Sequence, residues 1–443
     1  MLVLALIIIP FAAIFVSPAD AEVSNWQKGA SIVPTSPTDF SSSSFQQSVQ
    51  NLKNDGANYV SLIVPYYQSN QGSIDIGAGW NTPTDAALIS AINYAHSVGL
   101  KVMLKPHVEL YSNAWRAYIN PGDRDGWFAA YGNILNHLAD IGKQTGAEEI
   151  CIGAELISLA TFTSNSNNTE RWVSLINDVR SRYDGLLTYS ANWGKDGFEE
   201  EVSDIGFWPN LDYIGISAYY ELGWDTNVSA LTSAWSGWDE SRIKPLADKY
   251  GKPILFTEIG YRSVSGATAH PWDSASGGSY DPTAQENSFE ALFQYWNSKP
   301  YFTGLHMWHW SSDPNYGGEG NIDYTPRGKP AENTIRNWFG SAPDEATTTP
   351  EVIATTTPEV IATTTPEIIA TTTPEVIATT TPEVIATTTP EVIATTTPEI
   401  VTPPVSTTTP DPVDMSSLHQ RISDLTDRIN RLFERIELLS SRR

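Results

Sequence analysis

Two glutamates follow apolar stretches that are typical of buried β-strands. Glu155 comes shortly after Ile150–Ile152 in "CIGAE", and Glu258 follows Ile254–Phe256 in "KPILFTE". Burying a charge costs several kcal/mol unless the group is paired or hydrogen-bonded. A single glutamate of this kind is best interpreted as an ion-pair partner, for example Glu258 with Arg262. Two of them, both flanked by Trp and Tyr, favour acid–base chemistry.

Other polar and aromatic residues follow further strand-like runs. They are Lys105, His107 and Glu109; Asn192 and Trp193; Tyr219 and Tyr220; Arg262; and Trp308, His309 and Trp310. Paired carboxylates suit glycoside hydrolysis, in which one acid protonates the leaving oxygen and the other attacks or activates water. Aromatic rings suit the same substrates because their flat faces cover the apolar C–H faces of sugars.

Metal, nucleotide and serine chemistry have less support. His107 with Glu109 could ligate a metal, but the chain has no H-E-x-x-H motif, and Gly317–Asp323 lacks the aspartate spacing of a calcium loop. No G-x-S-x-G elbow occurs, and no glycine-rich phosphate fingerprint follows the first strand-like run. We therefore expect neither a metal nor a cofactor.

Eight strand-like runs alternate with helix-like runs. The predicted strands are Gly29–Pro34, Ala57–Tyr67, Lys101–Leu110, Glu149–Ser158, Leu186–Trp193, Leu211–Tyr220, Pro253–Tyr261 and Thr303–Trp310. The predicted helices include Thr84–Ser97, Trp127–Thr145, Glu170–Tyr183 and Thr283–Trp296. This alternation favours an α/β fold, a (β/α)8 TIM barrel, with an open doubly wound sheet as the alternative. In such a barrel the fourth and seventh strand ends would bring Glu155 and Glu258 to the same mouth.

Composition narrows the function classes. The 443-residue chain has a formal net charge of −25, which disfavours binding to nucleic acid. Its single cysteine, Cys151, lies in an apolar run, so no internal disulfide can form and the residue is interpreted as part of the core.

The first residues resemble a secretory signal peptide. An apolar run from Leu2 to Val16 precedes Ala19-Asp20-Ala21, a small-x-small cleavage site, so we expect residues 1–21 to be removed. No Lys or Arg precedes the apolar run, and an uncleaved anchor is the alternative. Either interpretation predicts a secreted or cell-surface protein.

Two segments of different composition follow the predicted barrel, which we place at residues 22–340. Residues 347–402 repeat "TTTPEVIA" or a close variant seven times, and proline at this period blocks helices and central strands. Residues 341–412 are interpreted as a Thr/Pro-rich stalk, disordered and semi-extended, whose role is a spacer; a glycosylated stalk or a peptide ligand is the alternative.

The tail, residues 413–443, has the pattern of a coiled-coil helix. Its apolar residues alternate in steps of three and four: Met415, Leu418, Ile422, Leu425, Ile429, Leu432, Ile436 and Leu439. Ile at most a positions with Leu at every d position favours a parallel dimer. The usual g–e ion pairs are missing, which leaves the register weakly specified, and an amphipathic helix on another surface is the alternative.

Seven motifs, in order, resemble glycoside hydrolase family 113. They are "LKPHVE", "WRAYI", "CIGAEL", "YSANWG", "LDYIGISAYY", "PILFTEIGYRS" and "YTPRGKPAE", and the resemblance covers residues 26–339. The family belongs to a clan of retaining barrel glycosidases with glutamates at strands four and seven. The resemblance implies an endo-β-1,4-mannanase acting on a polysaccharide or oligosaccharide.

The resemblance also implies residue roles. Glu155 would be the acid/base, Glu258 the nucleophile, and Tyr219 or Tyr220 would orient Glu258. The remaining implied contacts are Lys105, His107, Asn192 and Arg262 lining the sugar site, with Trp308 or Trp310 as the platform beneath the sugar. The clan usually has Asn before the acid/base, where this chain has Ala154. Hydrolysis of another β-linked polymer such as β-glucan, or carbohydrate binding by an inactive barrel, are the alternatives.

Overall fold

The computed structural model describes residues 25–194, 200–275 and 277–340. The predicted barrel, residues 22–340, is therefore described almost in full. The predicted signal peptide (1–21), stalk (341–412) and coiled-coil helix (413–443) lie outside the described residues.

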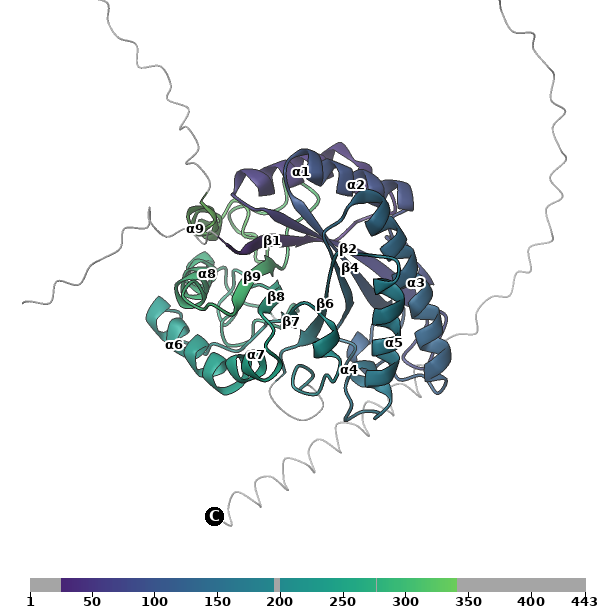
Figure 1. Ribbon diagram of the computed structural model, residues 1–443. Coiled ribbons are helices and arrows are strands. Elements are labelled where there is room, and N and C mark those ends of the chain that lie inside the picture. Colours follow the sequence, from purple (N-terminus) through teal and green to yellow (C-terminus); the bar gives the residue numbers. More distant parts are fainter. Residues whose placement is uncertain (1–24, 195–199, 276, 341–443) are drawn as a thin grey trace, which may run out of the picture. The chain divides into compact units, whose positions relative to one another are not determined.

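Eight parallel strands close into a barrel (Figure 1). They are β1 (Gln27–Ile32), β2 (Tyr59–Gln68), β4 (Lys101–Leu110), β5 (Glu149–Ala154), β6 (Leu186–Asn192), β7 (Ile214–Ser217), β8 (Ile254–Ile259) and β9 (Phe302–Met307). Each strand pairs with its neighbour in the chain, and β1 pairs with both β9 and β2. The β1–β2 pairing, with Ser31 opposite Ser61, closes the ring, so the open-sheet alternative is wrong. A short strand, β3 (Gly77–Ala78), runs antiparallel to β2.

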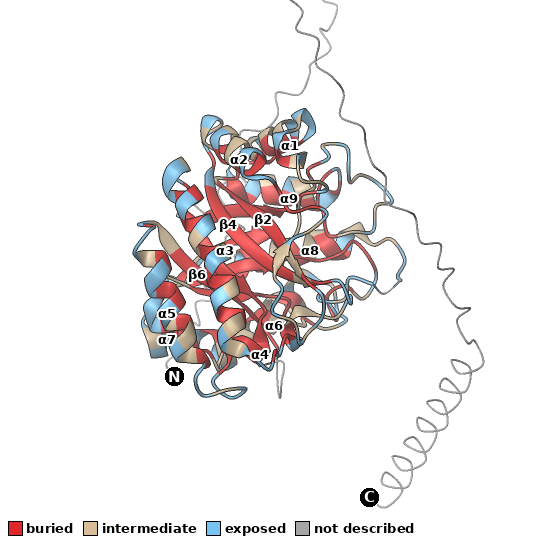
Figure 2. Cartoon of the chain, turned by 90° about the vertical axis from the view of Figure 1, so that its right-hand side faces the viewer, coloured by how far each residue is buried: buried red, intermediate tan, exposed pale blue. Residues whose placement is uncertain are grey.

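Helices surround the ring of strands (Figure 1). They are α1 (Ser43–Asn54), α2 (Asp85–Ser97), α3 (Arg124–Thr145), α4 (Ile157–Ala160), α5 (Asn168–Arg180), α6 (Val228–Trp238), α7 (Lys244–Tyr250), α8 (Pro282–Trp296) and α9 (Pro330–Phe339). Several begin at a side-chain cap: Ser42, Thr84 and Asp123 each accept a hydrogen bond from the backbone N–H three residues later. Figure 2 shows that their inner faces are buried while their outer faces reach solvent.

The barrel interior is filled with side chains rather than hollow. At the β1–β9 pair, Gly29 stands opposite His306, and a Cβ atom at Gly29 would lie only 2.4 Å from the imidazole Nδ1. His306 Nε2 lies 3.0 Å from the Gln27 Oε1 atom, and the Gln27 amide in turn donates to Glu149 at 3.0 Å. This layer supports the mouth of the barrel from below.

In the described part of the chain, every helix is too short or too polar to cross a membrane.

Candidate active site

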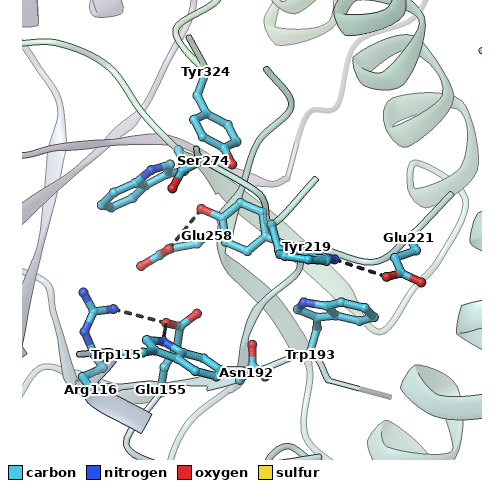
Figure 3. Close-up of a pocket in the computed structure, with 12 residues that line it drawn as sticks. Trp115, Arg116, Glu155, Asn192, Trp193, Tyr219, Glu221, Glu258, Ser274 and Tyr324 are labelled. Atoms are coloured by element: carbon cyan, nitrogen blue, oxygen red, sulfur yellow. Dashed lines mark hydrogen bonds and ion pairs between the residues drawn. The ribbon is translucent and has the colours of Figure 1, made fainter. Parts of the chain in front are cut away.

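A cavity of about 590 Å³ contains both predicted carboxylates (Figure 3). Most of its lining comes from the C-terminal ends of the strands and the loops that follow them, where parallel barrels carry their chemistry. The lining residues are Trp115, Arg116, Glu155, Asn192, Trp193, Tyr219, Glu221, Glu258, Trp272, Ser274, Trp308 and Tyr324.

Glu258 projects from β8 and is held on both carboxylate oxygens. Oε1 accepts a hydrogen bond from Lys105 Nζ at 2.6 Å and lies 3.4 Å from His107 Nε2. The Tyr219 hydroxyl donates to Oε2 at 3.1 Å. Burial by itself raises the pKa of Glu258, but the Lys105 ammonium and His107 outweigh it and hold the pKa well below its usual range. Glu258 is therefore an ionised carboxylate on the cavity wall.

Lys105 and His107 act on Glu258 from beneath the cavity. Both come from β4 and are buried, and neither belongs to the described residues that line the cavity. The Lys105 ammonium also donates to the Thr257 carbonyl at 3.1 Å, and the His107 ring stacks on Trp308 with 5.9 Å between centroids. In this structure they contact Glu258 and Trp308, which do line the cavity, and their contact with a sugar stays a prediction.

Glu155 follows the end of β5 in a left-handed conformation. Its φ is 54°, which is uncommon for a residue with a Cβ and persists only where the surroundings enforce it. Its own N–H donates to the Ser190 carbonyl at 2.8 Å. Its Oε2 accepts from the Trp115 indole N–H at 3.1 Å and from Arg116 at 3.2 Å. This backbone turn aims the carboxyl into the cavity, as Figure 3 shows.

Arg116 joins Glu155 to a second carboxylate, which is half-buried. Its other terminal nitrogen donates to Glu109, and Glu109 Oε1 lies 3.6 Å from His107 Nδ1. Burial acts to raise the pKa of Glu109, but Arg116 and His107 lower it to about 2. Acidic and basic side chains therefore alternate without a break from Glu155 through Arg116, Glu109 and His107 to Glu258.

Glu201 braces the other side of Glu155. The Leu156 N–H donates to the Tyr189 hydroxyl at 2.8 Å, and that hydroxyl donates to Glu201 Oε1 at 2.6 Å. Glu201 Oε2 accepts from the Asn192 backbone N–H, also at 2.6 Å. Burial raises the pKa of Glu201 to about 8, although both hydrogen bonds act to lower it. One buried acid thus fixes the residue after Glu155 and the end of β6.

Where the sequence left two residues open for one role, the structure distinguishes between them. Asn192, Tyr219 and Trp308 line the cavity. Tyr220 is instead buried against Trp193 and Trp235, because successive residues of an extended segment face opposite ways.

Trp310 and Arg262 lie outside the lining. Trp310 is buried, donates its indole N–H to the Ser48 carbonyl at 3.0 Å and has Arg327 over its ring. Arg262 is almost wholly buried and is not one of the lining residues of the described chain. Lys105 Nζ forms an ion pair with Glu258 Oε1 at 2.6 Å.

Several site residues were missed from the sequence because they come from loops. Arg116, Glu221, Trp272, Ser274 and Tyr324 line the cavity but follow no strand end directly. Arg116 and Tyr324 left a signal, as parts of the "WRAYI" and "YTPRGKPAE" motifs. Within residues 25–194, 200–275 and 277–340, no three His, Cys, Asp or Glu side chains are grouped to hold a metal ion.

Solved structures share this fold over the barrel. A structure described as a GH113 beta-1,4-mannanase matches with a TM-score of 0.63 and 28% identity, covering 72% of this chain and 100% of that one. The GH113 beta-mannanase AaManA from Alicyclobacillus acidocaldarius, in complex with ManMIm, matches with a TM-score of 0.62 and 27% identity, covering 73% and 99%. No curated protein sequence matches.

The family model described as Glycoside Hydrolase Family 113 matches residues 33–352, well over half of the chain. The match includes both cavity carboxylates and every residue described above as holding them. The chain therefore belongs to glycoside hydrolase family 113 and is a glycoside hydrolase.

Proposed function

We propose that this protein is a retaining endo-β-1,4-mannanase with Glu258 as nucleophile and Glu155 as acid/base. The observation that carries the proposal is the ionised Glu258, held by Lys105, His107 and Tyr219 in the cavity that also contains Glu155. Support for the substrate comes from the solved GH113 relatives, whose descriptions name β-mannanases.

The mechanism is a double displacement. The Glu258 carboxylate attacks the anomeric carbon as Glu155 gives its proton to the departing glycosidic oxygen, which leaves a glycosyl-enzyme ester and a shortened chain. Glu155, now a carboxylate, then takes a proton from water as the water oxygen attacks the same carbon. This step releases Glu258 and restores the proton on Glu155. The retaining mechanism predicts a carboxyl separation of about 5–5.5 Å in the complex.

The surrounding residues favour this division of roles. Lys105 and Tyr219 donate to Glu258 and His107 Nε2 lies 3.4 Å from it, which stabilises the charge of Glu258 before the attack and orients its oxygens. Glu155 has cationic Arg116 on Oε2, so the carboxylate formed after proton transfer has a ready ion-pair partner. Trp308 supplies an aromatic face on the wall of the cavity, suited to the apolar side of a sugar.

Azide rescue tests the two roles separately. With an activated aryl β-mannoside, Glu258→Ala should lose turnover and, on adding azide, form an α-mannosyl azide. Glu155→Ala should still form the glycosyl-enzyme from that substrate and then stall, and azide should release a β-mannosyl azide. Near-normal activity of Glu258→Ala on every substrate that the parent cleaves would reject the assignment.

β-Glucan hydrolysis is the second candidate. Ala154 stands where the clan usually has an Asn that contacts the sugar 2-hydroxyl, and a methyl side chain cannot make that hydrogen bond. Recognition at C2, the carbon at which mannose and glucose differ, must come from elsewhere. Asn192 lines the cavity and offers an amide. A panel of mannan, glucan and xylan oligosaccharides decides between the candidates by kcat/KM.

Location and assembly complete the proposal. The resemblance of residues 1–21 to a signal peptide supports export. The repeat and heptad patterns of residues 341–443 support a barrel that is displayed on a spacer and dimerises through its tail. Detecting the mature N-terminus at Glu22 in culture medium would test export and cleavage together.

A further inference from the structure

An aromatic row runs from the cavity to the protein surface. Trp272 lines the cavity and is 50% exposed, while Trp224 is 73% exposed. His270 lies between them, with its ring edge-to-face against both: the centroids are 5.7 Å apart for Trp272, at an interplanar angle of 66°, and 5.5 Å apart for Trp224, at 86°. We call Trp272, His270 and Trp224 the aromatic ledge.

The ledge is held in place by the loops that carry it. The Trp272 indole N–H donates to Glu221 Oε1 at 3.2 Å. His270 Nδ1 lies 3.9 Å from the same carboxylate oxygen. Glu221 therefore orients the Trp272 ring through a hydrogen bond and lies beside His270, from a position on the cavity wall.

Trp224 rests on backbone rather than projecting freely. A Cβ atom at Gly266 would lie 3.0 Å from the Trp224 ring, so the absence of a side chain there lets the ring lie against the loop. Thr268 joins the two loops: its carbonyl accepts the Leu222 N–H at 2.8 Å, and its hydroxyl donates to the Gly223 carbonyl at 2.6 Å. A preformed aromatic surface loses little entropy when a ligand binds.

We propose that the aromatic ledge binds the sugar residues of the substrate that extend beyond the cavity. The inference rests on the proposed function, because it takes the ligand to be the same β-linked polysaccharide. An exposed aromatic row continuous with a polar catalytic cavity fits a chain of sugars, whose C–H faces stack on rings while its hydroxyls stay in water. The ledge would make the enzyme prefer long chains.

The test compares substrates of two lengths. Trp224→Ala should raise KM for mannohexaose roughly tenfold, equivalent to about 1.4 kcal/mol, and leave kcat/KM for mannotriose within about twofold. Trp224→Tyr keeps a ring and should recover most of the loss. Trp80→Ala is the matched control, because Trp80 is 64% exposed and is not one of the described cavity-lining residues.

Oligosaccharide binding to a catalytically inactive variant distinguishes failure of the ledge proposal from failure of the proposed function. In a Glu258→Gln background, calorimetric titration should give a lower Kd for mannohexaose than for mannotriose, and Trp224→Ala should remove that difference. Equal affinity for both lengths in the background protein would overturn the ledge, as would equal losses in Trp224→Ala and Trp80→Ala. A parent enzyme that cleaves neither oligosaccharide would instead overturn the proposed function.

Discussion

Lys105 decides the charge of Glu258, the proposed nucleophile. Glu258 is 4% exposed, and a carboxyl group so buried would favour its neutral form without a cation beside it. Lys105 supplies that cation at 2.6 Å, and the resulting pKa lies well below the ordinary value. The same contact leaves the Lys105 side chain wholly buried with its charge matched.

Lys105→Gln should therefore move the acidic limb of the pH–kcat/KM profile to higher pH. The sign follows from the charge: removing a positive neighbour raises the pKa of Glu258, so a higher pH is needed to ionise the nucleophile. Tyr219→Phe is the control, because it removes one hydrogen bond without removing a charge. An acidic limb that stays in place in Lys105→Gln would contradict the role given to Lys105.

The pKa of Glu201 is shifted in the opposite direction from that of Glu258. Burial raises its pKa from 4.5 to about 8 in the folded protein, so the folded state holds a proton that the unfolded state has released between these values. Its contribution to the free energy of unfolding is full below about pH 4.5 and is lost as the pH rises through 8. Glu201→Gln cannot titrate and should show a flatter decline of stability over this window, measured by urea unfolding at several pH values.

Glu201→Ala should be worse than Glu201→Gln at every pH. It leaves the Tyr189 hydroxyl and the Asn192 N–H without their buried acceptor, at a cost of about 1–3 kcal/mol. Because Tyr189 also fixes the residue after Glu155, kcat should fall more than KM rises. Identical pH dependence in parent and Glu201→Gln would show that Glu201 is ionised throughout.

At the scale of elements, the strands were predictable because each is a nearly continuous apolar run buried on both faces. All eight predicted strands are present, and Lys101–Leu110 has the predicted bounds. The errors are at strand ends: predicted Glu149–Ser158 stops at Ala154, because the apolar residues after Glu155 enter the short helix α4. Closure of the barrel could not be predicted from the sequence, since it depends on a pairing between β1 and β2 rather than on any local pattern.

The same distinction between strands and loops separates the site residues that could be predicted from those that could not. Glu155 and Glu258 were found because a charged residue at the end of a buried strand is unusual in sequence. Arg116, Glu201 and Trp272 were not found, because loops bring them to the site and loop conformation leaves no periodic signal. The choice of Tyr219 over Tyr220 needed the direction of a side chain, which a one-residue shift reverses.

The packed interior of the barrel predicts a sharp difference between two glycine substitutions. Gly29→Ala would place a Cβ 2.4 Å from the His306 ring between β1 and β9, and overpacking of this kind costs about 1–3 kcal/mol. Gly237→Ala, in α6, meets nothing within 4 Å and should be neutral or stabilise by up to about 1 kcal/mol. Thermal unfolding of both variants tests this, and equal effects would contradict a filled barrel interior.

At the scale of the whole molecule, the barrel matches the full length of a solved chain. The solved GH113 structure with 28% identity is covered over 100% of its length by 72% of this chain. We therefore expect a protein truncated after Gly340 to keep its specific activity on short oligosaccharides and to unfold within a few degrees of the full chain. Aggregation of the truncated protein, or a much lower Tm, would mean that the stalk or tail supports the barrel.

The tail should be what makes the protein associate. Its apolar seam, from Met415 to Leu439, keeps the alternation of three and four throughout, and a helix of this length gains stability in water mainly through packing against another helix. Sedimentation equilibrium should show the full-length protein as a dimer and the protein truncated after Gly340 as a monomer. Ile429→Asp is the sharper variant, because it puts a charge at the centre of the seam and leaves length and composition nearly unchanged. Full-length protein that sediments as a monomer at all concentrations, or Ile429→Asp that still dimerises, would exclude the coiled-coil interpretation and leave the alternative of a helix lying on another surface.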